Sequence, residues 1–212
     1  MSQPESTAPS PLPVEPAQKA PTEAEQRDLL HRKLPAVLDH FRITSWDVLL
    51  VGDGSGQSWS MGCGWACAVI DKATMMRKLL WGGWSSGTVG IGEMMPYLHG
   101  LAWYHANVGK LVRKQNKSKL LEVHCICDNE TVVRQGQREM DRDANAPLWA
   151  AIDQCLRNGY LATWHWARRD TIGLNSLVDH VSRCARLAVS ELSMDSMVPE
   201  MPGASIYNFN PG

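Results

Sequence analysis

Apolar residues in this chain follow two spacings, and their order along the sequence predicts a mixed sheet covered by helices. Continuous apolar runs typical of buried strands occur at 48–51, 59–70, 76–84, 120–127 and 160–166. Apolar residues recur at helical intervals over about 90–112, 130–138, 146–158 and 174–192. Three successive strands, followed by alternating helices and strands, predict an α/β fold with a mixed five-stranded sheet. The first three strands are expected to be antiparallel and the rest parallel, with helices on both faces.

The two ends of the chain differ in composition from the middle. Residues 1–21 hold six prolines among small and polar residues, so they are expected to form a disordered lead. An accessory helical segment follows at 22–44, and Pro35 is expected to kink or split its helix. Residues 45–192 are expected to form the folded domain, and the proline-containing tail 193–212 is expected to be flexible.

Composition is typical of a soluble protein with one core: 212 residues, of which 44% are hydrophobic and 20% charged. No apolar run approaches the roughly 20 residues that a membrane-spanning helix needs. The N-terminal region lacks an apolar secretion signal, so an intracellular, cytoplasmic protein with no membrane partner is expected. The net charge of −1 gives no overall attraction to nucleic acid, although it is compatible with a local basic rim.

The six cysteines are expected to pack in the core of a reduced protein. A disulfide framework is typical of short secreted chains, and this chain is long enough to fold without one. A zinc site is disfavoured because the closely spaced pairs lie on one face of an expected strand: Cys63 with Cys67, and Cys125 with Cys127.

Four acidic residues carry the candidate chemistry: Asp53, Glu93, Asp128 and Asp179. Asp53 and Asp128 each end an apolar run, whereas the other two fall where helices are expected to begin or run. Pro96 indicates that its helix begins shortly before it, which would put Glu93 at or near the helix N-terminus. Buried carboxylates are costly unless positive charge gathers them. The pattern therefore predicts two Mg²⁺ ions, which Mn²⁺ could replace, and phosphoryl-transfer chemistry on a nucleic acid.

Taken singly, each acid has an ordinary structural explanation, as a turn residue, a helix cap or a surface charge. Taken in order, their local motifs resemble those of the ribonuclease H family, over about residues 45–190. The motifs are Asp53-Gly-Ser-Gly, Glu93 in the first long helix, Asp128-Asn-Glu-Thr-Val-Val, Trp164-His-Trp in the fifth strand, and Asn175-Ser-Leu-Val-Asp179. The likeness is to the type 1 enzymes of the ribonuclease H-like superfamily, which also contains the retroviral integrases.

This resemblance implies a function and a role for each acid. It implies a metal-dependent endonuclease that hydrolyses the RNA strand of RNA–DNA hybrids by a two-metal-ion mechanism, leaving 5′-phosphate and 3′-hydroxyl ends. Asp53 would bridge both ions, with Asp179 on one side of the pair. Glu93 and Asp128 would hold the other side, and Glu93 would also help to position the attacking water.

Nucleic-acid contacts are expected beside the acids, at Gly54, Ser55, Asn129, Arg168, Arg169 and Asn175. Turn geometry and helix capping are the alternative roles for the glycine and the asparagines. The chain departs from the family in the loop 167–173, which lacks a histidine often found there, and at Val89 and Gly90, which replace polar amides. Two other functions therefore stay open: a ribonuclease H-like DNA nuclease, resolvase or strand transferase, and a non-catalytic scaffold that binds nucleic acid or protein.

Overall fold

The computed structural model describes residues 22–56, 62–115, 120–169 and 171–192. The strands are β1 (Val48–Gly56), β2 (Cys63–Asp71), β3 (Arg77–Trp84), β4 (Leu121–Cys127) and β5 (Tyr160–Trp166). The helices are α1 (Glu23–His40), α2 (Val89–Tyr104), the π-helix η2 (His105–Gly109), α3 (Lys110–Gln115), α4 (Glu130–Gly136), the 3₁₀-helix η3 (Asp143–Asn145), α5 (Ala146–Leu156) and α6 (Gly173–Leu192). The predicted disordered lead, the predicted flexible tail and the first residues of the predicted second strand lie outside the described residues.

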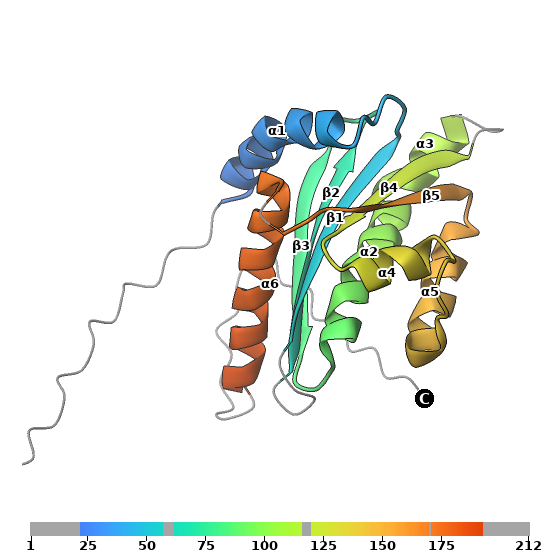
Figure 1. The fold of residues 1–212 in the computed structure, drawn as a ribbon. Coiled ribbons are helices and arrows are strands. Elements are labelled where there is room, and N and C mark those ends of the chain that lie inside the picture. Colours follow the sequence, from blue (N-terminus) through green and yellow to red (C-terminus); the bar gives the residue numbers. More distant parts are fainter. Residues whose placement is uncertain (1–21, 57–61, 116–119, 170, 193–212) are drawn as a thin grey trace, which may run out of the picture.

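The five strands form one mixed sheet in the order β3-β2-β1-β4-β5 (Figure 1). The first three are antiparallel neighbours, and β4 and β5 run parallel to β1. This confirms the predicted fold class. Among the described helices, none is both long enough and apolar enough to span a membrane.

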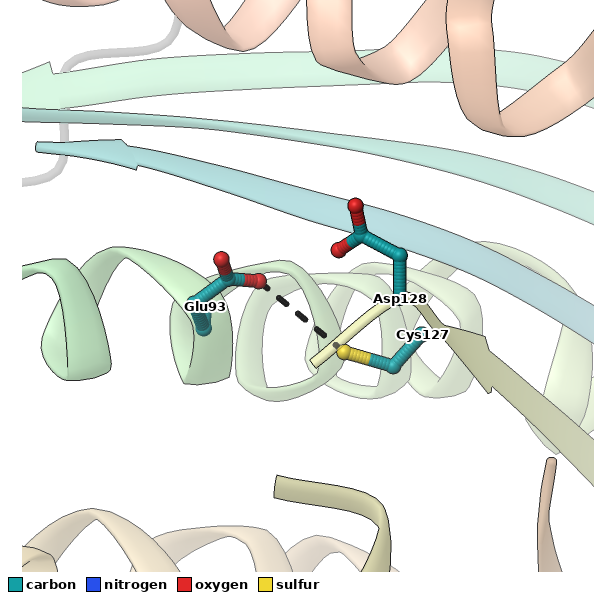
Figure 2. Close-up of side chains that lie close together, drawn as sticks. All are labelled: Glu93, Cys127 and Asp128. Atoms are coloured by element: carbon teal, nitrogen blue, oxygen red, sulfur yellow. Dashed lines mark hydrogen bonds between the residues drawn. The ribbon is translucent and has the colours of Figure 1, made fainter. Parts of the chain in front are cut away.

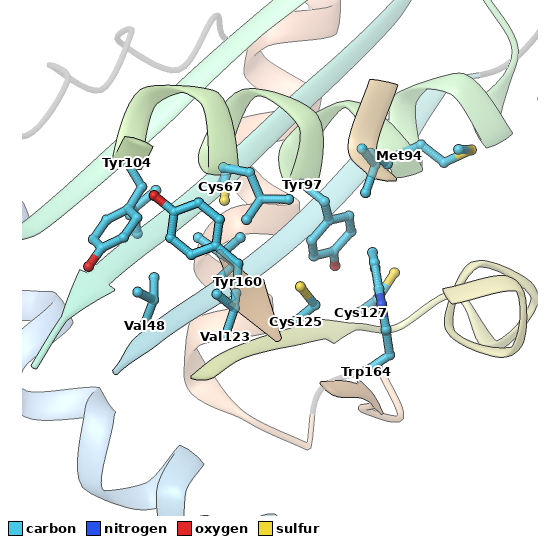
Figure 3. Packing of buried hydrophobic residues seen from close by; sticks show 14 of the residues in the cluster. Val48, Cys67, Met94, Tyr97, Tyr104, Val123, Cys125, Cys127, Tyr160 and Trp164 are labelled. Carbon is cyan, nitrogen blue, oxygen red and sulfur yellow. The ribbon is translucent and has the colours of Figure 1, made fainter. Parts of the chain in front are cut away.

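Side chains alternate along β1 and so contribute to a separate core on each face of the sheet. Val48 and Leu50 belong to the core under α2, α4 and α5, where the predicted core cysteines Cys67, Cys125 and Cys127 also pack (Figure 3). Leu49 and Val51 belong to the core under α1 and α6 on the opposite face. Two helical layers therefore enclose a sheet that is apolar on both sides (Figure 1).

The N-terminal helix α1 packs against the folded domain. Its side chains Leu30, Leu34 and Val37 are buried in the same core as residues of α6. The helix continues through Pro35, so of the two predicted effects, a kink or a split, the split does not occur. Proline removes one backbone hydrogen bond, and burial of Leu34 and Val37 beside it holds both halves of the helix against the sheet.

The glycine-rich segment after the first apolar run is part of the strand. The apolar run predicts a strand over 48–51 with a glycine-rich exit, but residues Gly52 to Gly56 continue to pair with Cys67 to Cys63 of β2. Asp53 therefore has a fixed backbone and a defined side-chain direction. The ladder with β2 outweighs the weak strand preference of glycine.

Pro96 lies inside α2 and not in its first turn, although the helix itself begins close to the start at about 90 that the helical spacing predicted. The helix begins at Val89, where Thr88 accepts a hydrogen bond from the Ile91 backbone N–H at 3.2 Å. Pro96 is buried against Gly52, whose added Cβ would lie 2.5 Å from the proline Cβ. This close packing explains why the proline is tolerated there. Glu93 consequently lies one turn beyond the helix start.

Candidate functional site

The candidate site lies where β1 extends beyond the end of its pairing with the parallel strand β4. Pairing of β1 with β4 ends at Val51 opposite Ile126, and β1 continues to Gly56. Asp53 lies two residues beyond the last pair, and Asp128 follows the end of β4. Carboxyl ends of parallel strands share one edge of a sheet, and an open position there is a common place for ligands. We call this open end of the sheet the notch.

Asp53 faces α6 from the centre of the notch. It is only 2% exposed, and its Oδ2 accepts a hydrogen bond from the Ser182 hydroxyl at 2.6 Å. Its Oδ1 is buried and has no hydrogen-bond partner among the described residues. Burial raises the pKa of Asp53, Ser182 lowers it, and the carboxylates of Asp128 and Asp179 raise it, which together bring it to about 7. Asp53 therefore resists ionisation unless positive charge is supplied.

Asp128 and Asp179 each contact an arginine. The Nε of Arg169 donates to Asp128 Oδ2 at 3.2 Å, and the guanidinium of Arg183 lies 2.8 Å from Asp179 Oδ2. The pKa of Arg169 is raised by Asp128 first and, more weakly, by Asp179 and Asp53. Arg169 thus lies beside three of the four predicted acids.

Glu93 enters the notch from α2, on the other side of the sheet. Its side chain is buried, and burial followed by the charges of Asp53 and Asp128 raises its pKa well above the usual range. Hydrogen bonds from the Gly54 backbone and the Asn129 side chain act in the opposite direction. No cation is among the groups that shift the pKa of Glu93.

Glu93, Cys127 and Asp128 form the tightest set of candidate metal-binding groups in the described part of the chain. One ligand atom from each lies within 4.8 Å of the others (Figure 2). The Cys127 thiol donates to Glu93 Oε2 at 3.9 Å, and burial raises its pKa well above the usual range, so the thiol stays protonated. A protonated thiol is a poor metal ligand. The oxygen atoms of Glu93 and Asp128 are the better ligands in this set.

The structure brings all four predicted acids to the notch. Asp53 is within electrostatic range of the other three, because Asp128 and Asp179 affect its pKa and it affects that of Glu93. Glu93 lies on α2 and Asp179 on α6, so the two helical acids approach from opposite faces of the sheet. Asp53 and Asp179 do not join the set within 4.8 Å. Their role as metal ligands stays a prediction.

Two glycines explain how helices on opposite faces reach the same strand ends. A Cβ atom on Gly54 would lie 2.2 Å from the backbone N of Glu93, and one on Gly64 would lie 2.2 Å from the backbone O of Ser182. No side chain fits at either position, so α2 and α6 rest directly on strand backbone. We call these positions the glycine seats. They set the depth at which Glu93 and Ser182 approach Asp53.

The residues that were predicted to contact nucleic acid differ in what they touch in the structure. Gly54 packs under α2, and Ser55 Oγ accepts from Arg186 Nε at 3.1 Å. Asn129 caps α4 by accepting from the Val132 N–H at 3.3 Å, which is its ordinary alternative role. Asn175 is buried, with no hydrogen-bond partner for either amide atom among the described residues, and Arg168 is exposed. Contact of these residues and Arg169 with nucleic acid stays a prediction.

Sequence reasoning missed three α6 residues that line the notch: Ser182, Arg183 and Arg186. Residues three, four and seven positions after Asp179 share its helical face, so the spacing contained the signal. Cys127 was also missed as a neighbour of Glu93, because a buried strand cysteine gives no sign of what it touches.

Comparison with known proteins supports the fold through structure alone. No protein-family model and no curated protein sequence matches this chain. Among solved structures, the ribonuclease H1 isolated from compost by a metagenomic approach aligns with a TM-score of 0.55 at 15% identity, covering 71% of this chain and 100% of that one. The N-terminal ribonuclease H domain of a Mycobacterium tuberculosis protein aligns with a TM-score of 0.53 at 17% identity, covering 70% of this chain and 99% of that domain. The strand order, the notch and these alignments together establish that the chain has the ribonuclease H-like fold.

Proposed function

We propose that this chain is a metal-dependent endonuclease of the ribonuclease H type that hydrolyses the RNA strand of RNA–DNA hybrids. The observation that supports it most is the state of Asp53, a buried carboxylate with two acidic neighbours and one unpartnered oxygen. Such a group is unfavourable unless a cation completes its surroundings. A scaffold without a ligand would gain stability by replacing it.

The residues at the notch fit divalent cations. Asp53, Glu93, Asp128 and Asp179 offer carboxylate oxygens, which are the ligands that Mg²⁺ and Mn²⁺ prefer. Asp53 would bridge two ions, with Glu93 and Asp128 on the α2 side and Asp179 on the α6 side. Bound there, two such ions would supply a deprotonated water and stabilise the leaving oxygen, giving 5′-phosphate and 3′-hydroxyl ends.

The contacts of Arg169 with Asp128 and of Arg183 with Asp179 leave these acids able to bind a metal ion. The side chains of Arg169 and Arg183 are 62% and 54% exposed, so solvent weakens their ion pairs with Asp128 and Asp179, whose side chains are 8% and 23% exposed. A divalent ion held by several buried carboxylates therefore displaces them at little cost. Once released, both guanidinium groups stay beside the acids, where they can bind phosphate oxygens.

Four arginines surround the notch and form what we call the arginine rim: Arg168, Arg169, Arg183 and Arg186. A rim of this kind attracts the phosphate backbone locally, although the net charge of the chain is −1. Phosphate contacts carry no sequence information, and a hybrid duplex is recognised by shape and 2′-hydroxyls. We therefore expect cleavage with little sequence preference and with strong dependence on salt.

A cleavage assay with matched substrates tests the proposal. Labelled RNA–DNA hybrid, double-stranded DNA and a four-way junction are incubated with Mg²⁺, Mn²⁺ or chelator, and the ends of the products are analysed. We expect cleavage of the hybrid alone, only with a divalent ion. Asp53→Asn should abolish cleavage and keep hybrid binding, whereas Asp143→Asn, on exposed η3, should cleave as the wild type does.

The remaining outcomes separate the alternative functions. Cleavage confined to double-stranded DNA or to the junction would replace the proposal with a DNA nuclease or resolvase. Hybrid binding without cleavage of any substrate would leave a non-catalytic scaffold.

A further inference from the structure

Ser182 is a fully buried hydroxyl in direct contact with the central carboxylate of the notch. Its Oγ lies 2.6 Å from Asp53 Oδ2 and 2.9 Å from the backbone O of Asp179. A hydroxyl has one proton to donate, so the two acceptors compete for it. A carboxylate is the stronger acceptor and gives the shorter bond, which favours Asp53.

The position of Ser182 is fixed by backbone packing and not by its own side chain. At the α6 glycine seat, a Cβ on Gly64 would lie 2.2 Å from Ser182 O and 2.4 Å from Arg186 N. Gly64 itself is paired with Ser55 of β1. The α6 backbone therefore cannot shift away from β1 or towards it without losing this contact.

A second hydrogen bond holds the same faces together. Ser182 and Arg186 are four residues apart on α6, and they contact Asp53 and Ser55, which are two residues apart on β1. These spacings place each pair on one face of its element. The contact between Ser182 and Asp53 is therefore set by how α6 packs along β1, and not by the side-chain rotamer of Ser182 alone.

The Ser182 hydrogen bond makes the two oxygens of Asp53 different. Oδ2 is held by the hydroxyl, whereas Oδ1 is buried without a partner in the part of the chain that the structure describes. With one oxygen held, rotation of the carboxylate about its last bond is restricted. The oxygen left over is the one available to a ligand.

We propose that Ser182 is a positioning residue for the metal site: its hydroxyl holds Asp53 by Oδ2 so that Oδ1 is presented to divalent cations. This inference rests on the proposed function, because it assumes that Asp53 is a metal ligand. Residues that hold a metal ligand in place commonly change metal affinity or activity by about 10–100-fold when they are removed.

A purely structural role makes a different prediction. Serine hydroxyls often bond to a backbone carbonyl of the preceding turn, and that bond affects only the helix. Removing such a bond would lower the melting temperature and leave the metal affinity of the folded protein unchanged. Metal affinity measured well below the melting temperature therefore separates the two roles.

The test measures Mn²⁺ binding by electron paramagnetic resonance of the free ion, together with melting temperature and hybrid cleavage. We expect Ser182→Ala to bind Mn²⁺ about 10-fold more weakly than the wild type and to cleave correspondingly slowly. Asp53→Asn should lose most Mn²⁺ binding. Ser176→Ala, an exposed serine on the same helix, should match the wild type in every measurement.

Two results would overturn the inference. One is a folded Ser182→Ala protein that binds Mn²⁺ as tightly as the wild type, whatever its melting temperature. The other applies if Ser182→Ala does not fold, in which case Ser182→Thr is measured because it keeps the hydroxyl. Near-normal Mn²⁺ affinity of Ser182→Thr supports the role of the hydroxyl. An affinity as weak as that of Asp53→Asn contradicts it.

Failure of the proposed function would look different from failure of this inference. A wild-type protein that binds Mn²⁺ but cleaves no hybrid contradicts the nuclease proposal alone. The affinity difference between Ser182→Ala and Ser176→Ala still tests the role of the hydroxyl in that case.

Discussion

Helices α2 and α6 approach Asp53 from opposite faces of the sheet. Both pack closely against strand backbone, but the side chains that they bring to Asp53 differ in chemistry. Both rest on a glycine seat, at Gly54 and at Gly64. On the α2 side, the hydrogen bonds that lower the pKa of the buried Glu93 come from a backbone group and an amide. On the α6 side, an arginine pairs with Asp179 and a hydroxyl holds Asp53.

In the proposed metal-dependent nuclease, this difference separates two requirements. The α2 side fixes a carboxylate in an apolar environment, where its charge has to be balanced by a ligand. The α6 side carries the exposed positive charge that a phosphate backbone needs. Geometry and substrate attraction are thus divided between the two faces, and variants can disturb one without the other.

Replacing the glycine at either glycine seat should give the largest loss of stability, and the loss should be similar on the two faces of the sheet. Gly54→Ala and Gly64→Ala each place a Cβ 2.2 Å from helix backbone, which cannot move as a flexible side chain can. We expect each to lower the free energy of unfolding by about 3 kcal/mol, because the helix has to separate from the sheet. Urea denaturation in chelator measures this without any contribution from metal.

Gly90→Ala is the matched control for the seats. Its Cβ would meet Asn145 Nδ2 at 3.4 Å and Thr88 Oγ1 at 3.8 Å, and alanine is favoured over glycine in a helix by up to about 1 kcal/mol. Stability equal to or above that of the wild type is expected. If Gly64→Ala were as stable as Gly90→Ala, α6 would not be seated on the strand, and the symmetry between the two faces would be lost.

A pH series should reveal the uncompensated charge around Asp53. Its pKa is raised to about 7 by burial, and that of Glu93 is also raised, so the folded protein holds protons that the unfolded chain releases. The sign follows: in chelator, stability is greatest below about pH 4 for these groups and falls as the pH rises towards about 7 and above. Denaturation curves between pH 5 and 8 measure the decline.

Divalent ions and one variant sharpen the pH experiment. Mg²⁺ should remove most of the decline, since it stabilises the ionised carboxylates. Asp53→Asn should also flatten the profile, because the substituted amide does not titrate. A metal-free wild type whose stability rises steadily from pH 5 to pH 8 would contradict the charge balance described for the notch.

The sequence predicted the parts of the site that depend on strand ends and helix order. The proximity of Asp53 and Asp128 was predicted from their motifs and the resemblance that these carry, and the parallel pairing of β1 with β4 accounts for it. Glu93 and Asp179 were placed through their motifs and helices. The five strands, with the first three antiparallel and the others parallel, were also predicted correctly, because each strand had its own apolar run.

Features that depend on contact between distant residues were not predictable in the same way. Pro96 was expected in the first turn of its helix and lies further along it, because its packing against Gly52 of β1 has no local signature. The Gly-rich segment was expected to be a loop, because its pairing with β2 could not be seen in its own composition. Ser182 lies on the predicted face of its helix, but the carboxylate that it holds is 129 residues away.

Substitutions of Asn129 test whether a neutral hydrogen-bond donor beside Glu93, on the α2 side, contributes to metal binding. The expected loss of stability is smaller than at the glycine seats. It caps α4 and also hydrogen-bonds to Glu93. Asn129→Ala should cost about 1 kcal/mol through the lost cap, and Asn129→Ser should restore most of that stability. Because serine is too short to replace the amide at Glu93, Asn129→Ser should still bind Mn²⁺ more weakly than the wild type. Equal Mn²⁺ affinity for the two proteins would remove Asn129 from the metal site.

The smallest effect is expected at Arg183, where the α6 side can be compared with an ordinary surface pair. Arg183 with Asp179 and Arg32 with Asp28 are both (i, i+4) pairs, at 2.8 and 3.0 Å. In chelator, Arg183→Ala and Arg32→Ala should each lower the free energy of unfolding by about 0.3–0.5 kcal/mol, and less at high salt. With Mg²⁺ present, the loss at Arg183 should disappear, because Asp179 then has a stronger partner, while the loss at Arg32 should persist. Denaturation curves of both variants with and without Mg²⁺ measure this, and an Mg²⁺-independent loss at Arg183 would show that Asp179 does not hold the ion.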